Sequence, residues 1–358
     1  MAEEALVTST TRHMVYLQRL ESQEVNEFTA FLQRMDRDIR RRLADKDLTE
    51  FSRTRLERLL AQVDKDLAKI WDGYFDELAG HLGEIAGYEA EFEARNLQNA
   101  IAPELSIEAV IPAAAQVRAA VQSTPLSVRG PGGGQLLEPF IRDWGSNERK
   151  RVTGTIRQGY FEGRTTQQII RDIRGTKANN YRDGVLAITQ RNADAVVRTA
   201  VAHTATTARM ETLQANADLL KGMRWVSTLD SKTSSQCRSL DGTVFPLDKG
   251  PRPPIHIRCR SAVAGELDDD LKALEKGATR ASKDGYVSAN QTYYQWLKKQ
   301  PEAFVVDAIG PTRAKLLLSG GLSAERFAAL NLGRDFKPLT LAEMQQKEPN
   351  AFKRAGVE

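Results

Sequence analysis

Cys237, His256 and Cys259 are the only cluster of soft metal-ligand types in this sequence, and the two cysteines of the whole chain both fall in it. Thiolate and imidazole are ligands that zinc prefers, and a loop rich in proline is a suitable carrier for a His-x-x-Cys pair. The segment therefore predicts a candidate zinc site, with zinc as the one cofactor that the sequence suggests.

The spacing does not fix a fourth ligand, which Asp230, Asp241 or His203 could supply. Two other interpretations remain open: a Cys237–Cys259 disulfide, or two buried thiols held beside a histidine that hydrogen-bonds to the backbone. A disulfide is disfavoured in a reducing cytosol. In each case, we expect the cluster to stabilise its surroundings.

Signatures of enzymes are absent from the chain. It has no phosphate-binding loop, no Gly-x-Ser-x-Gly elbow and no His-Glu-x-x-His pair, and it contains only 4 histidines. The pattern of the zinc deaminases is also missing, so nothing supplies their acid–base glutamate. We therefore assign no catalytic residue and expect no enzymatic activity.

A small β-containing module is predicted to position the cluster. The segment MRWVSTLD from Met223 has the aromatic and β-branched content of a strand, and TVF after the Asp241-Gly242 turn predicts another. SKTSSQCRSL between them favours a short helix, and a last strand should follow Cys259. This module should occupy residues 223–265.

Helices are predicted for most of the remaining chain, so the fold class is mainly α with a small β-containing module (α+β). Apolar residues at helical spacing predict two long helices, about 11–43 and 49–82, which should fold back on each other as a hairpin. Gly163 should end one later helix and Thr165 should cap the next. The predicted regions are a helical hairpin or arm in 1–128, a glycine-rich linker in 129–135, a helical scaffold in 136–222, the module in 223–265 and a helical extension in 266–358. Within the extension, helices are predicted at 289–299, 311–318 and 339–346.

Composition is that of an ordinary soluble protein. The 358 residues are 41% hydrophobic and 27% charged, and 51 Lys and Arg nearly balance 47 Asp and Glu. These values exclude collagen, wholesale disorder and a disulfide scaffold. We expect no signal peptide and no membrane partner, because no stretch approaches about 20 apolar residues.

Charge is distributed unevenly along the chain. Residues 142–209 carry 13 Lys and Arg against 6 acidic residues, and residues 230–260 carry 6 against 3. Such segments could face phosphate, although a solvated helical face explains them almost as well. The candidate nucleic-acid contacts are Arg149, Lys150, Arg151, Arg164, Arg171, Arg174, Arg252, Arg258 and Arg260.

From Trp225 the chain reads WVSTLDSKTSSQCRSLDGTVF, and from Pro253 it reads PPIHIRCR. This part of the chain resembles the core of the phage Mu F-like head morphogenesis proteins. In that family a tryptophan, a D-x-x-T-s-x-x-C turn, a D-G pair and a P-P-x-H-x-x-C-R loop follow in this order, and the likeness covers roughly residues 158–341. Many members end the loop in Cys-Arg-Cys, whereas Ser261 follows Arg260 here, which removes one candidate thiolate. The matching residues are Trp225, Asp230, Thr233, Cys237, Asp241, Gly242, Pro253, Pro254, His256, Cys259 and Arg260.

The resemblance implies a structural minor head protein of a tailed bacteriophage, which aids head assembly and DNA packaging or ejection. It implies the portal protein as a partner, with the major capsid or scaffold protein and packaged double-stranded DNA as further candidates, and several copies around the portal. The expected location is the capsid interior at the portal vertex, after assembly in the host cytoplasm. Two alternatives are an ejected DNA-binding internal protein of the virion and, less favoured, a metal-dependent enzyme or toxin module.

Overall fold

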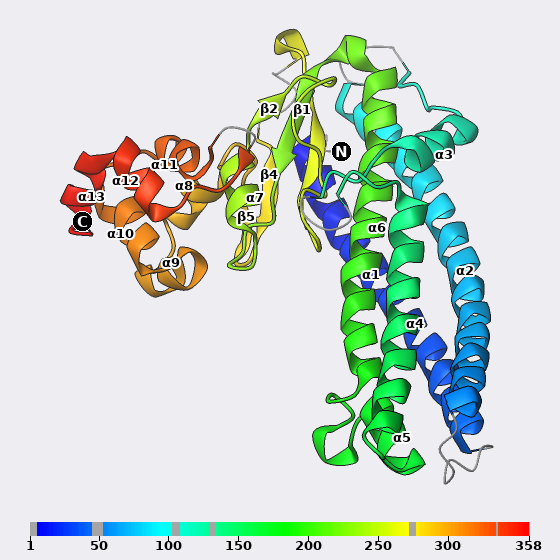
Figure 1. The fold of residues 1–358 in the computed structure, drawn as a ribbon. Helices are drawn as coiled ribbons and strands as arrows, with labels where there is room; N and C mark the ends of the chain where they lie inside the picture. The colour runs from blue at the N-terminus through cyan, green and yellow to red at the C-terminus, as the bar shows by residue number, and fades with distance from the viewer. Residues whose placement is uncertain are drawn as a thin grey trace.

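The computed structural model describes residues 6–44, 53–101, 108–128, 133–271, 277–333 and 336–357. Long helices form a rod, two small sheets lie beside one end of it, and short helices make up the C-terminal part (Figure 1). The predicted fold class, mainly α with a small β-containing module, is confirmed.

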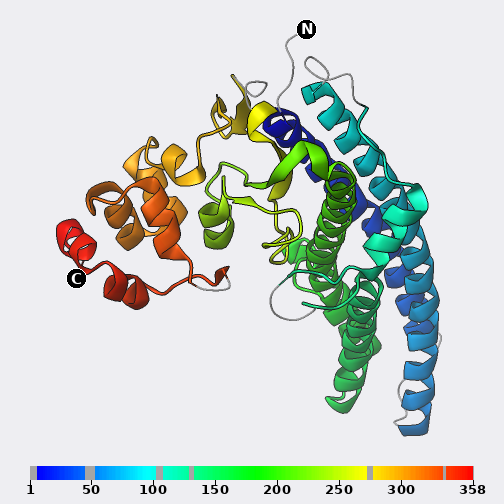
Figure 2. The ribbon, with the colours of Figure 1, turned by 90° about the horizontal axis from the view of Figure 1, so that it is seen from above.

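Six helices belong to the rod. Four of them, α1, α2, α4 and α6, run alongside one another (Figures 1 and 2). At 1.5 Å per residue, the two longest, α1 with 39 residues and α2 with 49, measure about 58 and about 74 Å. Their bounds are α1 Leu6–Ala44, α2 Arg53–Ile101, α3 Ala114–Ser123, α4 Leu137–Phe161, α5 Thr166–Arg174 and α6 Val185–Ala215.

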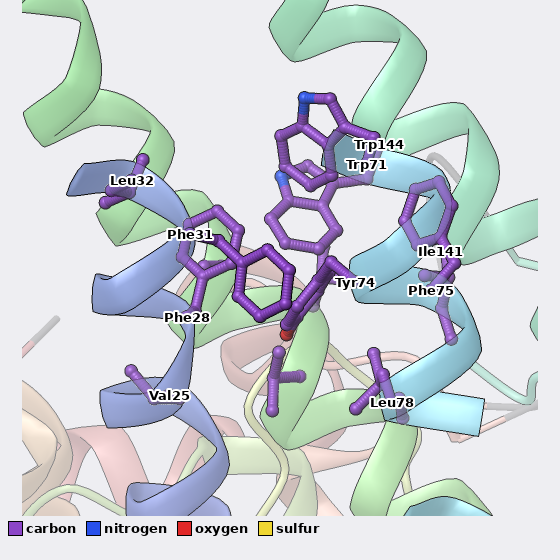
Figure 3. Close-up of a cluster of buried hydrophobic side chains, with 14 of the residues drawn as sticks. Val25, Phe28, Phe31, Leu32, Trp71, Tyr74, Phe75, Leu78, Ile141 and Trp144 are labelled. Carbon is purple, nitrogen blue, oxygen red and sulfur yellow. The ribbon is translucent and has the colours of Figure 1, made fainter. Parts of the chain in front are cut away.

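An aromatic cluster holds α1, α2 and α4 together near the middle of the rod (Figure 3). The rings of Trp71 and Trp144 meet edge to face with centroids 4.7 Å apart, and Phe28 meets Tyr74 at 5.0 Å. A Cβ atom at Gly145 would lie 2.5 Å from the Phe75 ring, so the glycine allows α4 to approach α2 this closely.

Local sequence signals set the break between α4 and α5 as predicted. Gly163 takes a φ of +67°, which glycine adopts without strain, and the chain then turns back. The Thr165 hydroxyl accepts from the Gln168 backbone N–H at 3.3 Å, while the Gln168 side chain accepts from the Thr165 N–H at 2.7 Å. This capping box begins α5.

The predicted hairpin and the predicted scaffold share one hydrophobic core. Side chains from α1, α2 and α3 and side chains from α4, α5 and α6 belong to the same buried cluster. The hairpin is therefore built into the rod and does not project from it as a separate arm. Of the predicted linker in 129–135, residues 129–132 lie outside the described residues.

Buried charges join the rod to the sheet. Arg209 of α6 donates to Glu89 Oε2 of α2 at 3.0 Å and to the Val263 carbonyl at 2.9 Å, and its Nε lies 3.2 Å from Glu93 Oε2. His13 of α1 contacts the other oxygen of Glu89. All four side chains are nearly inaccessible to solvent, so each charge depends on the others for stabilisation.

The module is a three-stranded antiparallel sheet in the order β2-β1-β3, with a short helix between the first two strands in the chain. In the register, Trp225 pairs with Val263 and Met223 with Phe245. The start of α1 lies against the sheets, where Thr8 Oγ1 accepts from the Thr279 N–H at 3.0 Å. The bounds are β1 Leu220–Val226, α7 Ser235–Leu240, β2 Val244–Phe245, β3 Ala262–Leu267, β4 Thr279–Ser282 and β5 Gly285–Ser288.

The C-terminal helices build a second core of their own, which also takes in Leu229 from the module. The predicted helices at 311–318 and 339–346 are present, whereas the one predicted at 289–299 is confined to the five residues of α8. The β4–β5 hairpin and helices α9, α11 and α13 were not predicted. The bounds are α8 Tyr293–Leu297, α9 Glu302–Ile309, α10 Pro311–Ser319, α11 Ala324–Asn331, α12 Leu341–Lys347 and α13 Pro349–Ala355.

No helix in the described residues combines the length and the apolar character needed to cross a membrane.

Removal of residues 1–128 should prevent the remainder from folding. The deletion exposes the apolar faces of α4 and α6, which α1 and α2 cover in the intact chain. We expect residues 129–358 alone to aggregate, and co-expression with residues 1–128 to restore a soluble complex of the two fragments. Solubility and circular dichroism measure both results. A cooperative thermal transition of residues 129–358 alone would contradict the shared core.

The buried charge cluster should make stability depend on pH. Burial raises the pKa of Glu93 to about 7, against the opposing charge of Arg209, whereas an unfolded chain has an ordinary glutamate with a pKa near 4.3. The folded state therefore binds this proton more tightly, and stability should fall as the pH rises from about 5 to 7.

Glu93→Gln should remove this dependence, because glutamine resembles the protonated acid. At pH 8 we expect its free energy of unfolding to exceed that of the wild type by roughly 3 to 4 kcal/mol, with the difference nearly vanishing at pH 4.5 and below. Denaturant titrations at several pH values measure it. Glu91→Gln, an exposed position on the same helix, is the control. If Glu93→Gln is no more stable than the wild type at pH 8, the pKa of Glu93 is not raised by burial in the folded state.

Candidate metal centre

Cys237, His256 and Cys259 converge from a helix and a loop of the module. Cys237 lies in the first turn of α7, where its N–H donates to the capping Ser234 Oγ at 3.2 Å. Cys259 immediately precedes the segment that enters β3, and its N–H donates to the His256 carbonyl at 3.1 Å. Antiparallel pairing of β1 with β3 brings this loop back to α7.

The distances among the three side chains are short. Cys237 Sγ lies 3.2 Å from His256 Nε2 and 3.6 Å from Cys259 Sγ. His256 Nδ1 is 2.9 Å from the carbonyl oxygen of Ile257, which orients the imidazole with Nε2 toward the sulfurs. The sulfurs are not bonded, because a disulfide requires about 2.05 Å.

The pKa values of the two thiols shift in opposite directions. The hydrogen bond from Cys237 lowers the pKa of Cys259 well below its usual range, against the effect of burial, and His256 lowers it further. The same hydrogen bond and burial raise the pKa of Cys237. Burial alone would lower the pKa of His256, but the Cys259 thiolate raises it. These shifts favour the thiolate form of Cys259 and the protonated form of His256.

The three residues fit a tetrahedral zinc ion. Two thiolates bound at about 2.3 Å with tetrahedral angles lie about 3.8 Å apart, close to the 3.6 Å separation of the two sulfurs. The donor set has the softness that zinc prefers, and both sulfurs are buried, with exposures of 1% and 2%. Such a site would be structural, because neither sulfur is accessible to a substrate.

The candidate fourth ligands are not brought to the cluster. Within the described residues, the group of converging ligands contains only the two cysteines and His256. Asp230 is bound by the Arg260 guanidinium at 2.6 and 2.8 Å, and Asp241 is bound by Arg280 at 2.9 Å. His203 packs against the end of α3, where burial lowers its pKa to about 4.

Two arginine–carboxylate pairs form the frame around the cluster. Arg260 and Asp230 join the loop to the turn before α7, and Thr233 donates to the same carboxylate at 3.1 Å. Arg280 of β4 binds Asp241, which also accepts from the Ser227 N–H at 2.7 Å. These contacts fix both ends of α7, and therefore Cys237.

Sequence reasoning missed Arg280 and Ser227. The Ser227 hydroxyl donates to the Cys237 carbonyl at 2.8 Å and accepts from Trp225 Nε1 at 3.0 Å, so it connects β1 to α7. Arg280 is 2% exposed, but nothing in its sequence neighbourhood distinguishes it from the exposed arginines of the chain. Only the fold reveals these roles.

The family model described as Phage Mu protein F like protein matches residues 150–264. The chain contains a phage Mu F-like region. That region begins within α4 and ends within β3, so it includes Cys237, His256 and Cys259. No curated protein and no solved structure matches the chain significantly.

This match confirms the resemblance of the region to phage Mu F-like proteins and indicates a phage head morphogenesis protein, a component of the virion. The match runs from residue 150 to residue 264, so α1, α2, α3 and the C-terminal helices all lie outside it. Arg280, which completes the frame of the cluster, lies outside it as well.

The candidate nucleic-acid contacts occupy three separate places on the chain. Arg149, Lys150 and Arg151 lie along α4, whereas Arg164, Arg171 and Arg174 lie at the end of the rod that is remote from the sheets (Figure 1). The third group, Arg252, Arg258 and Arg260, belongs to the loop before β3. The nine residues therefore do not form one continuous surface.

Most of these arginines already have partners within the fold. Each of six guanidinium groups lies within 4.0 Å of a carboxylate, and Arg252 donates to a backbone carbonyl at 2.6 Å. Within the described part of the chain, Lys150 and Arg171 are exposed and make no ion pair. The six pairs are Arg149–Asp64, Arg151–Glu148, Arg164–Asp172, Arg174–Asp36, Arg258–Asp194 and Arg260–Asp230.

Tag-free protein should retain one zinc ion per chain at the Cys–His cluster through dialysis against a weak chelator. A structural zinc site contributes about 10 kcal/mol, so Cys259→Ser should lose the ion and unfold at a temperature several degrees lower. Elemental analysis and calorimetry measure both effects. Ser239→Ala, a change on the same helix away from the sulfurs, is the control.

A second variant tests the geometry of the site. Ser261 hydrogen-bonds to the Cys237 side chain, so Ser261→Cys places a third sulfur beside the cluster. We expect it to bind zinc at least about tenfold more tightly than the wild type. Wild-type protein that holds no zinc, or a Cys259→Ser variant that holds as much as the wild type, would contradict the prediction.

Proposed function

We propose that this protein is a minor head protein of a tailed bacteriophage, located inside the capsid at the portal vertex, where it aids head assembly and DNA packaging or ejection. The observation that carries the proposal is the phage Mu F-like match over residues 150–264. The proposed partner is the portal protein, with several copies of the chain around it and the major capsid or scaffold protein as further candidates.

The shape of the molecule supports a bridging role. The rod is about 74 Å long along α2, and the sheets and C-terminal helices lie beside one of its ends (Figure 1). Its long surfaces carry many charged side chains, and its apolar stripes are already buried in the shared core. A rigid rod with a separate compact part can contact two components of a head at the same time.

Packaged DNA is the second proposed partner. A hollow of about 700 Å³ at the remote end of the rod is lined by Arg171, Arg174, Lys177 and Tyr181, among others. Cationic side chains of this kind hold phosphates without reading bases, so binding should be non-specific and should weaken with salt. Lys150, halfway along the rod, adds a further exposed cation.

The buried Cys–His cluster supports a structural role over the alternative of an enzyme or toxin module. Cys259 is 2% exposed, and the surrounding arginine pairs hold it inside the module. The other alternative is an internal protein that is ejected with the genome. The exposed cations would suit it as well as they suit a minor head protein, so an experiment must distinguish the two.

The test is supply of the chain in trans to phage particles that lack it. We expect few copies per virion by mass spectrometry and density at the portal vertex by electron cryomicroscopy. Lys150→Glu with Arg171→Glu should be incorporated normally but should package less DNA, because the double change reverses charge at exposed positions. Lys353→Glu, an exposed position on α13, is the control.

The fate of the chain after DNA release separates the two phage functions. A chain that remains with the empty capsid supports the minor head protein, and a chain lost with the genome supports the ejected internal protein. Particles that assemble and package normally without the chain would overturn both.

A further inference from the structure

A second group of metal-ligating side chains lies midway along the rod, between α1 and α2. Glu24 and Glu27 are one turn apart on α1, and His81 lies opposite them on α2. The two helices run antiparallel, so their contacting turns present these side chains to each other. The group is outside the Mu F-like match and is distinct from the cysteine cluster of the module.

Distances within the group are those of a site that could close around one ion. His81 Nδ1 lies 3.0 Å from Glu24 Oε2 and 3.6 Å from Glu27 Oε2. One ligand atom from each of the three residues falls within 4.8 Å of the others. The Glu24 side chain is 9% exposed, whereas Glu27 and His81 are 36% and 33% exposed, so solvent reaches the group from one side.

The charges of this group are not balanced by arginine, unlike those of the other buried acids in the rod. Glu21 is paired with Arg198, Glu89 with Arg209 and Glu148 with Arg151. Within the described residues, no lysine or arginine hydrogen-bonds or ion-pairs with Glu24 or Glu27.

Glu77, one turn before His81 on α2, adds a further negative charge near the group. Three carboxylates therefore surround one imidazole, which is an arrangement that a divalent cation stabilises.

We propose that Glu24, Glu27 and His81 bind a divalent transition-metal ion of the zinc class, which holds α1 to α2. Imidazole with two carboxylates is a donor set that suits zinc, and solvent can supply the remaining position. Binding through Nδ1 releases the proton that His81 shares with Glu24, and that proton passes to solvent.

A neighbouring side chain supports the arrangement. Gln23 Nε2 donates to Glu27 Oε1 at 3.1 Å, which leaves Oε2, the oxygen nearer to His81, available to a metal. Such outer contacts orient a ligand, and their loss commonly weakens metal binding by about 10-fold or more. Gln23 is thus a positioning residue for the site.

Cobalt(II) titration of the full-length, tag-free chain tests the proposal, because cobalt reports its ligands. Cobalt at the cysteine cluster gives a near-ultraviolet sulfur-to-metal band, and cobalt bound by carboxylates and imidazole gives none. We expect a bound ion without this band, and a rise in the melting temperature that tracks its binding.

His81→Ala and Glu27→Gln should each lose the ion that lacks the sulfur band, and should keep any signal from the cysteine cluster. Gln23→Ala should weaken the binding of that ion by about 10-fold. Glu91→Gln, which removes an exposed carboxylate from α2, should bind cobalt like the wild type. Circular dichroism establishes that each variant is folded.

Three results would overturn the proposal. In the first, cobalt binds only with the sulfur band. In the second, His81→Ala and Glu27→Gln bind as much of the ion without the sulfur band as the wild type does. In the third, Glu91→Gln loses this ion to the same extent as His81→Ala and Glu27→Gln. Cys259→Ser separates this site from the other, because it should abolish the sulfur band and leave the second ion bound.

Discussion

Arg209 is the residue on which the relative placement of the rod and the sheet depends. Its guanidinium contacts Glu89 and Glu93 of α2 and the Val263 carbonyl of β3, all away from solvent. A buried charge is tolerated only when its partners are in position, so this contact allows one register of α2, α6 and β3. His13 brings α1 into the same cluster through Glu89.

The same constraint acts a second time inside the module. Asp230 and Asp241 each hold a guanidinium, and the two pairs fix the loop and the short helix that carry the cysteines. One of these arginines, Arg280, lies beyond the Mu F-like match, so the part of the module inside the match is completed by the part of the chain that follows it. The two cysteines and His256 are positioned by charge pairs in addition to the sheet.

The way in which the two buried networks combine suits the proposed function. They join a long helical rod, a compact module and a C-terminal set of helices into one body, with exposed cations at the remote end of the rod. A head component that must keep a fixed distance between its contacts gains from such a body. The group of Glu24, Glu27 and His81 lies between α1 and α2 at a place where neither glutamate is paired with an arginine or a lysine of the described residues. The negative charge of the two carboxylates is therefore not offset there by such a side chain.

The sequence by itself determined the features that depend on local residue patterns: the long helices, the break between two of them and the grouping of the two cysteines with His256. Helical periodicity predicted α1, α2 and the break at Gly163 and Thr165, and the types and spacing of Cys237, His256 and Cys259 predicted that they converge. The tertiary structure alone decided that the hairpin shares its core with the scaffold, that Arg280 holds Asp241, and that His81 meets Glu24. These contacts join residues that are far apart in the chain. In the sequence, residues such as Arg280 and Glu24 look like the many charged residues that are exposed to solvent. Burial in the folded chain removes water from a charged group, so its stabilisation then depends on the partner that the fold brings to it.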